Sequence, residues 1–141
     1  MEPLDLREHP PRAPHAILDG VVLLPRTIDK ARALLPGGNP GVYFIGPGLS
    51  SSLLEMLRIS EGDFAEVVAA SRDDAEVAAR VCANASAERR ERWTAIIEAL
   101  TVAGIPPETR PAFDALYGPR RPYELVLDVI ASDDDAMFAL T

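Results

Sequence analysis

Lysine and cysteine are nearly absent from this 141-residue sequence, which contains one of each, Lys30 and Cys82. A single cysteine cannot form a disulfide within the chain. Positive charge is also scarce, because 14 basic residues face 22 acidic ones and the net charge is −8. Binding to nucleic acid requires a clustered basic surface, and docking on an anionic membrane requires basic segments. The composition therefore argues against both kinds of partner.

Long hydrophobic runs and an N-terminal signal are missing as well. No run approaches the roughly 18 apolar residues of a membrane helix, and the polar, proline-rich start MEPLDLREHPPRAPH lacks a basic and then apolar leader. We therefore expect a cytoplasmic protein. The length suits one domain over residues 1–141. Within it, the four prolines of residues 1–15 predict an extended arm, because proline disfavours a helix there.

Metal and cofactor motifs are equally scarce. His9 and His15 are the only histidines, and their separation of six residues matches no familiar ligand spacing. A zinc site would therefore depend on distant carboxylates, and no G-x-S-x-G motif occurs. We expect no metal and no cofactor, and we expect Cys82 to be a small core residue.

Helical patterns dominate what the sequence does contain. Pro25 suits the first turn of a helix that runs to about Leu35, where PGGNPG ends it. The most regular apolar repeat, at i, i+3, i+4 and i+7, comprises Trp93, Ile96, Ile97 and Leu100. Three capping boxes predict further helix starts, at Ser52 with Glu55, Ser60 with Asp63, and Ser71 with Asp74.

Other segments are shorter or ambiguous. Residues 17–24 and 123–131 are apolar enough for helix or strand, with helix preferred for the second, and VYFI at 42–45 predicts a strand. A short helix is predicted for PAFDALY at 111–117. The acidic run 133–135 predicts the solvent-exposed first turn of another helix, which would begin after Ser132. Together the patterns predict a mainly α fold, a single compact helical domain with at most a small β element.

Five stretches, which together cover nearly the whole chain, carry a family resemblance. They are DLREHPPRAP, ILDGVVLLPRTIDKARA, GVYFIGPGLSSSLLEMLRISEGDF, RERWTAIIEAL and ELVLDVIASDDD. They resemble domain-of-unknown-function family 5069, an uncharacterised bacterial family with an LPRxIDKxRA core, which LPRTIDKARA matches specifically. The resemblance implies a small soluble bacterial protein and no established activity. Thr94, Gly46 and residues 48–51 depart from the family pattern.

The core motif also holds the strongest candidate site. On a helix over residues 25–35, Arg26, Asp29 and Lys30 share one face. Arg26 and Lys30 are a like-charged i, i+4 pair, which costs about 0.3 kcal/mol unless an anion lies between them. Asp29 supplies part of that negative charge, and a bound carboxylate or phosphate would supply the rest.

One interpretation of this patch is a small-molecule site. The protein would bind an anionic or carbonyl ligand. It would at most act on that ligand as a cofactor-independent isomerase, cyclase or hydrolase. Arg26 would orient the substrate, Asp29 would act as acid and base, and Lys30 would serve as a charge or nucleophilic amine. Tyr43 and Trp93 would bind the substrate. Tyr117 is a further aromatic candidate, and GPGLSSS is either an anion-binding loop or a plain turn.

The alternative is a noncatalytic helical protein that binds a partner or has a structural role. Arg26 and Lys30 would then tie their helix to the acidic C-terminal segment in a salt-bridged joint, and apolar helix faces would form a homodimer. A salt bridge from Lys30 to Asp128 or another C-terminal carboxylate, with no cavity beside it, would exclude the first interpretation.

Overall fold

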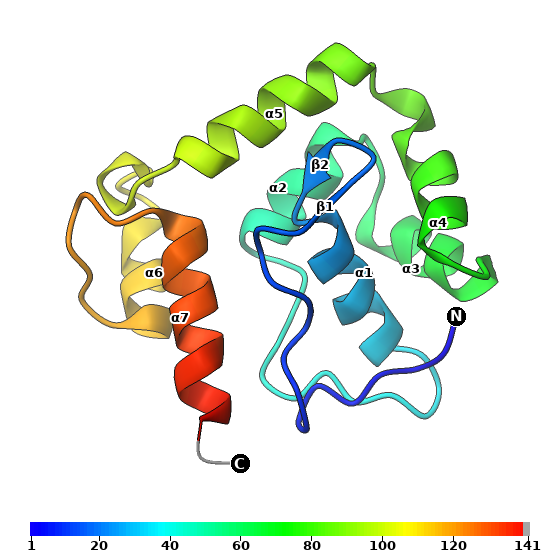
Figure 1. Cartoon of the computed structure of the whole chain (residues 1–141), viewed down its shortest axis with the longest axis horizontal. Coiled ribbons are helices and arrows are strands. Elements are labelled where there is room, and N and C mark those ends of the chain that lie inside the picture. Colours follow the sequence, from blue (N-terminus) through cyan, green and yellow to red (C-terminus); the bar gives the residue numbers. More distant parts are fainter. Residues whose placement is uncertain (140–141) are drawn as a thin grey trace.

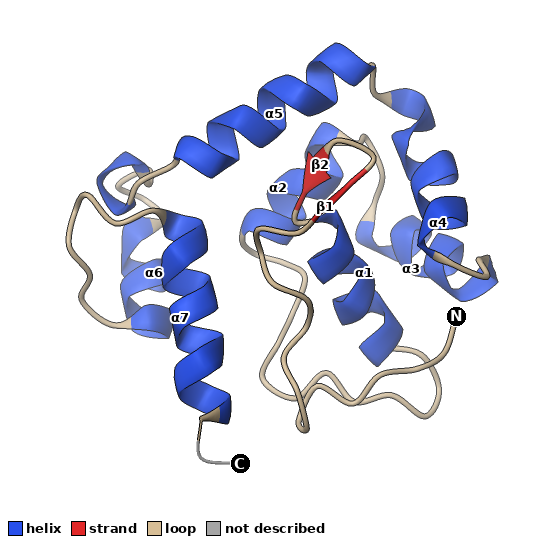
Figure 2. Cartoon of the chain, viewed as in Figure 1, coloured by secondary structure: helices blue, strands red, loops and turns tan. Residues whose placement is uncertain are grey.

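A computed structural model describes residues 1–139 as a mainly helical fold, as predicted (Figure 1). Over that range there are seven α-helices and one two-stranded antiparallel sheet (Figure 2). In chain order the elements are β1 (Ile17–Leu18), β2 (Val21–Val22), α1 (Leu24–Ala33), α2 (Leu49–Met56), α3 (Glu61–Ala70), α4 (Asp74–Val81), η1 (Cys82–Asn84), α5 (Ala87–Ala99), η2 (Val102–Gly104), α6 (Arg110–Tyr117) and α7 (Val126–Phe138). The small β element is thus present, although it lies outside the segment predicted to form it.

The long helix α5 connects two groups of helices. In Figure 1 it runs from α3 and α4 on one side to the paired helices α6 and α7 on the other, with α1 in the middle of the molecule. Helix α1 packs on α2 and α3, and α5 packs on β2 and α7. The C-terminal pair of helices therefore meets the N-terminal half of the chain beside α1.

The apolar segment 17–24 forms the β-hairpin and the first residue of α1. Asp19 and Gly20 link the strands with φ values of 51° and 76°, as a type I′ hairpin turn requires. Thr94 of α5 holds this hairpin, because its hydroxyl donates to the Gly20 carbonyl (2.8 Å) and accepts the Val22 N–H (3.2 Å). Thr94 therefore has a structural role, because it joins α5 to the hairpin.

The strand predicted for residues 42–45 is wrong. These residues form an irregular loop before α2. A strand needs a neighbouring edge to pair with, and the only two-stranded sheet of residues 1–139 pairs within the hairpin. Tyr43 instead closes a turn that begins at Pro40, with its N–H on the Pro40 carbonyl (3.0 Å), while Ile45 enters the core.

Of the three predicted capping boxes, one is confirmed. Ser60 accepts the Asp63 N–H at the start of α3 (3.0 Å). The prediction of a helix start at Ser52 is wrong, because α2 already begins at Leu49 after Gly48. The prediction that Ser71 caps the next helix is wrong as well. Its hydroxyl donates to the Val67 carbonyl of α3, and Asp73 caps α4.

The C-terminal helix corrects the prediction for residues 133–135. The preference for a helix in 123–131 is confirmed from Val126 onward, but α7 continues to Phe138. The acidic run therefore lies inside the helix and does not start it. Asp134 is buried, because it faces a guanidinium of α1. The other helices predicted near Pro25, Trp93 and residues 111–117 are confirmed as α1, α5 and α6.

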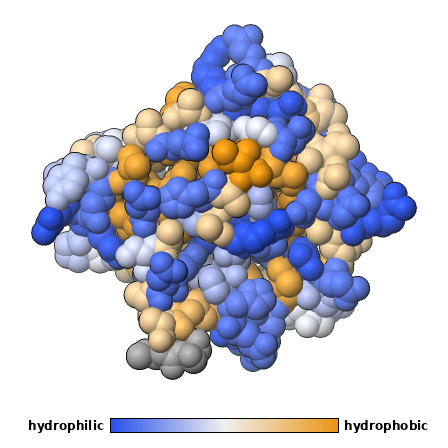
Figure 3. All heavy atoms as spheres, viewed as in Figure 1, coloured by the Kyte–Doolittle hydropathy of each residue, from blue (hydrophilic) through white to orange (hydrophobic). Residues whose placement is uncertain are grey.

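The hydrophobic core gathers around the hairpin, α1, α2 and α3. Its largest fully buried side chains include Phe64, Leu24, Ile28, Leu53 and Leu57. Cys82 is buried at its edge as predicted, and burial raises the pKa of its thiol to about 11. On the face in Figure 3, hydrophobic atoms form separate areas among hydrophilic ones.

The N-terminal arm has no helix, as its prolines predicted. Leu6 is buried, and backbone hydrogen bonds join Leu4 and Leu6 to Asn39 in the loop after α1. The arm is therefore laid along α1, and this path brings Arg12 to the polar face of that helix.

Candidate functional site

Helix α1 coincides with the motif LPRTIDKARA, and its polar residues are unusually buried. Arg26 is 3% exposed and Asp29 is 4% exposed, while Lys30 is partly buried. Charged side chains are almost never this buried unless they are paired. The partner of each charge therefore decides what the patch can do.

Arg26 is paired with Asp134 of α7. Its Nη1 donates to Asp134 Oδ2 at 2.6 Å and its Nη2 to Oδ1 at 3.2 Å, so the pair is bidentate. The Tyr43 hydroxyl donates to the same carboxylate at 2.7 Å, and the Tyr43 ring lies 5.4 Å from the guanidinium carbon. Burial and this carboxylate raise the pKa of the Tyr43 hydroxyl. Arg26 has no free donor fork for a ligand carboxylate.

Asp29 is paired with Arg12 of the N-terminal arm. Its carboxylate accepts the Arg12 backbone N–H at 2.8 Å and the guanidinium Nη2 at 3.0 Å. The same guanidinium reaches Asp74 at the start of α4, and Arg32 lies 3.8 Å from Asp29. Asp29 therefore joins the arm, α1 and α4, and it is not available as a general base.

Lys30 differs from its two neighbours on the helix. Its Nζ donates to the Ser50 hydroxyl at 3.2 Å, and no carboxylate of residues 1–139 lies within 4.0 Å of it. Asp128 is hydrogen-bonded to His15 instead. Burial, followed by the nearby positive charge of Arg26, lowers the pKa of Lys30 to about 8, although the charge of Asp134 opposes this shift.

The hydroxyl beside Lys30 is itself buried. Ser50 lies in the first turn of α2 and is 2% exposed. The Thr27 hydroxyl oxygen lies 2.9 Å from Ser50 Oγ and 2.9 Å from the Leu23 carbonyl oxygen. Thr27 has one hydroxyl proton, so it can donate to only one of these two oxygens at a time. The Ser50 hydroxyl lies between the Lys30 amine and the Thr27 hydroxyl, a position from which it can pass a proton between them.

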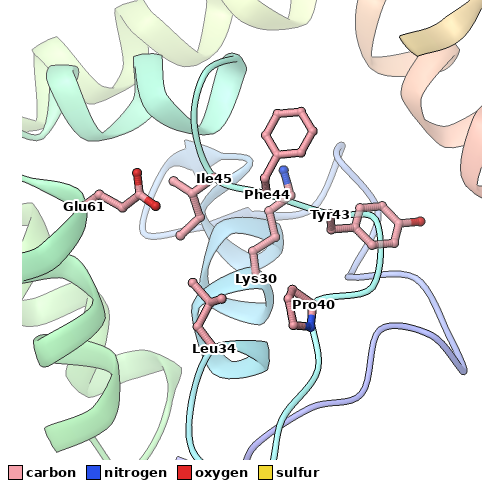
Figure 4. A pocket seen from close by; sticks show the side chains of 7 residues that line it. All are labelled: Lys30, Leu34, Pro40, Tyr43, Phe44, Ile45 and Glu61. Carbon is pink, nitrogen blue, oxygen red and sulfur yellow. The ribbon is translucent and has the colours of Figure 1, made fainter.

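A small cavity of about 110 Å³ adjoins Lys30. Its other walls are Leu34, Pro40, Tyr43, Phe44, Ile45 and Glu61. Figure 4 shows the Lys30 side chain rising from α1 toward the loop that carries Phe44 and Ile45, with the Glu61 carboxylate on the far side of Ile45. The Tyr43 hydroxyl points away from Ile45 and Glu61. The amine therefore lines a mainly apolar cavity whose second charged wall is Glu61.

The structure brings together only some of the residues that the sequence suggested. Lys30 and Tyr43 line the cavity, whereas Arg26 and Asp29 are held in ion pairs beside it. Trp93 does not line it, since it packs partly buried against the core from α5. Tyr117 does not line it either, and burial raises the pKa of its hydroxyl.

Sequence reasoning missed Ser50 and Glu61. The segment GPGLSSS, interpreted above as an anion-binding loop or a plain turn, leads into α2 and positions Ser50, but nothing in the pattern singled out which serine faces Lys30. Glu61 follows the correctly predicted cap Ser60. The capping pattern gave no reason to place its carboxylate near a cavity.

The comparison with protein families is decisive for the identity of the domain. The model of a domain of unknown function, DUF5069, matches residues 8–135. The chain belongs to the DUF5069 family. The matched part of this DUF5069 domain includes every residue of the cavity wall together with Ser50 and Asp134. Curated proteins give no match.

Two further observations limit the kinds of site in this DUF5069 domain. Within residues 1–139, no three His, Cys, Asp or Glu side chains gather in an arrangement that could hold a metal ion. In the same range, none of the helices is long and apolar enough to cross a membrane. The cavity beside α1 has an amine, Lys30 Nζ, at its mainly apolar wall.

Proposed function

We propose that the protein binds a small carbonyl compound in the cavity beside α1 and that Lys30 reacts with it as a nucleophilic amine. The observation that carries the proposal is the placement of Lys30 Nζ at a cavity wall, where among residues 1–139 it has a serine hydroxyl, and no carboxylate, as its hydrogen-bond partner. In this proposal the protein is a cytoplasmic small-molecule-binding protein that acts without metal or organic cofactor.

The chemistry requires the unprotonated amine. With a pKa of about 8, roughly one Lys30 side chain in ten is neutral at pH 7, against about one in three thousand for a lysine at its ordinary pKa of 10.5. The Nζ lone pair attacks the carbonyl carbon, the carbonyl oxygen takes up a proton, and loss of water leaves an imine on Nζ. Hydrolysis with one water regenerates the amine.

Ser50 fits a supporting role in this reaction. Its hydroxyl lies 3.2 Å from Nζ and 2.9 Å from the Thr27 hydroxyl, so it can accept a proton from the carbinolamine nitrogen and return one. An imine withdraws electrons from the carbon next to the imine carbon and so makes a proton on that carbon easier to remove. An isomerase or cyclase of carbonyl compounds would use this effect. Arg26 and Asp29 would act by positioning α1, because both are committed to other residues.

The noncatalytic alternative is supported by a different observation. The Arg26–Asp134 and Asp29–Arg12 pairs join α1 to α7 and to the N-terminal arm, as a salt-bridged joint would. That interpretation expected Lys30 to share in the joint with Arg26, but Lys30 takes part in neither pair. In this alternative, apolar helix faces form a homodimer and the cavity stays empty. The two proposals therefore differ in whether Lys30 reacts.

Reductive trapping tests the proposal directly, because the single lysine leaves only two amines in the chain, Lys30 and the Met1 α-amine. The purified protein is incubated at pH 7 with butanal and cyanoborohydride, and the adducts are located by peptide mass mapping. We expect Lys30 to be alkylated faster in the folded protein than in urea-unfolded protein, with a rate that saturates as the butanal concentration rises.

Lys30→Arg is the matched control, since it keeps the positive charge and leaves only the α-amine to react. Alkylation of that variant should be confined to Met1. Equal Lys30 rates in the folded and unfolded protein would instead favour the noncatalytic alternative.

A further inference from the structure

We infer that the compound taken up beside Lys30 is a short, uncharged aldehyde or ketone, and that Glu61 disfavours carbonyl compounds carrying a carboxylate. This inference rests on the proposed function of Lys30 and goes further by naming the class of substrate. It narrows the choice between anionic and carbonyl ligands that the sequence left open.

The first step is the charge around the cavity. Of its seven lining residues only Lys30 and Glu61 are charged. Arg26, another cation on the polar face of α1, has its guanidinium in a bidentate pair with Asp134. A ligand carboxylate would therefore find no free arginine among the described residues that line the cavity, where carboxylate recognition commonly uses one.

The second step is the position of Glu61. It lies at the first position of α3, is exposed, and forms no ion pair within the described part of the chain. Its Oε2 lies close to Gly46, since a Cβ built on Gly46 would be 3.6 Å from it. Residues 45 and 46 belong to the loop over Lys30, so the carboxylate presents negative charge at the cavity, where Lys30 is the one other charged group among the lining residues.

The third step concerns the protonation state that reacts. While Lys30 is an ammonium it attracts anions, but in that state it has no lone pair for the carbonyl carbon. Once it loses its proton, the cavity wall retains only the negative charge of Glu61. An anionic carbonyl compound is thus attracted to the unreactive state and repelled in the reactive one, whereas an uncharged compound is spared that repulsion.

The fourth step is size and polarity. The cavity volume of about 110 Å³ is below the roughly 150 Å³ of an engineered cavity that holds benzene, which corresponds to about four or five non-hydrogen atoms. Apolar walls from Leu34, Pro40 and Ile45 face that space, and Phe44 is 42% exposed beside it. A carbonyl compound with a short alkyl chain matches both the volume and the lining.

The test compares two four-carbon aldehydes, butanal and 4-oxobutanoate, which carry a methyl group and a larger, charged carboxylate at the end opposite the aldehyde. Each is used with cyanoborohydride at pH 7 on the full-length protein, and adducts at Lys30 and at the Met1 α-amine are quantified separately by peptide mapping. The Met1 adduct in the same sample corrects for the intrinsic reactivity of each aldehyde. We expect butanal to be preferred at Lys30, relative to Met1, by about tenfold.

Glu61→Gln isolates the carboxylate. Gln keeps the size and polarity of the side chain, so the preference for butanal should fall to about twofold or less if the charge of Glu61 causes it. Glu66→Gln is the matched control on an exposed position of the same helix, and it should leave the preference unchanged.

Each outcome decides a different point. Equal or faster trapping of 4-oxobutanoate at Lys30 overturns the uncharged class while leaving the proposed function intact. An unchanged preference in Glu61→Gln overturns the role of Glu61. The absence of any Lys30 adduct above that of the unfolded chain, with both aldehydes, overturns the proposed function itself and the inference with it.

Discussion

Two parts of the polar face of α1 contrast sharply. Arg26 and Asp29 each meet a side chain of opposite charge, Asp134 and Arg12, from a distant part of the chain. Lys30, one residue further along, donates to a hydroxyl, lines a cavity and has no ion pair within the described residues 1–139. The same helix therefore holds charges that join the fold and one charge that the fold leaves uncompensated.

This contrast teaches where a function resides in the patch. A buried ion pair broken on one side is costly, so the Arg26–Asp134 and Asp29–Arg12 pairs have a sufficient role in holding the fold together. An amine with a lowered pKa and no ionic partner costs stability without an evident structural return, and such groups cluster at functional sites. Of the three residues in the patch, Lys30 is therefore the candidate for chemistry. Each prediction below tests either the paired charges or Lys30.

The largest effect is expected when the Arg26–Asp134 pair is broken. Asp134→Asn leaves the buried guanidinium without its counter-charge, and we expect the free energy of unfolding to fall by about 3–5 kcal/mol. Urea denaturation at pH 7 measures it. Asp128→Asn, on the same helix but in an exposed contact with His15, should cost less than about 1 kcal/mol. Similar losses in the two variants would remove the structural side of the contrast.

Breaking the Asp29–Arg12 pair should have a smaller effect. Arg12→Met removes the guanidinium but keeps the backbone N–H that bonds to Asp29, and Arg32 stays nearby. We expect a loss of about 2 kcal/mol in the same urea experiment. Arg92→Met, which removes an exposed pair with Glu88 on α5, is the control and should change stability by less than about 0.5 kcal/mol.

The other side of the contrast is tested by the pH dependence of Lys30→Met. The folded pKa of about 8 lies below the ordinary value of 10.5. From about pH 8 to 10.5 the unfolded chain therefore keeps a proton that the folded protein has lost, and the stability contributed by Lys30 rises with pH. Below that range the cost of the buried ammonium is present in full.

The measured quantity is the difference in free energy of unfolding between the natural protein and Lys30→Met, from pH 7 to pH 10. It should rise with a limiting slope of about 1.4 kcal/mol per pH unit. Titrations of Tyr43 and Cys82 occur in both proteins and cancel in this difference. At pH 7 the variant should be at least as stable as the natural protein, and a marked loss there would mean that Lys30 has an unrecognised structural partner.

The sequence predicted the elements better than it predicted their partners. Periodicity and proline position located α1, α5 and α6 because these signals are local. The charge pattern placed Arg26, Asp29 and Lys30 on one helix, but their partners lie at residues 134, 12 and 50. No local pattern fixes such contacts. The hairpin was missed for a different reason, since its Asp-Gly turn signal was present but was read as part of an ambiguous apolar run.

The smallest effect, and the finest test of the contrast, is expected at Ser50. Ser50→Ala removes the one hydrogen-bond acceptor of the Lys30 ammonium within residues 1–139. Because that bond favours the charged form, its loss should lower the pKa of Lys30 further. The pH dependence of Lys30 alkylation, compared between the variant and the natural protein, measures this shift.

The direction of the change in rate separates two roles of the hydroxyl. If Ser50 only holds the amine, the variant should react faster at pH 7, since more of the amine is neutral. If Ser50 also carries a proton for the carbinolamine, the limiting rate above the pKa should fall even though the pKa falls with it. Ser52→Ala, elsewhere on α2, should change neither quantity. An unchanged pKa in Ser50→Ala would show that burial and Arg26 alone set the reactivity of Lys30, which removes the hydroxyl from the proposed site.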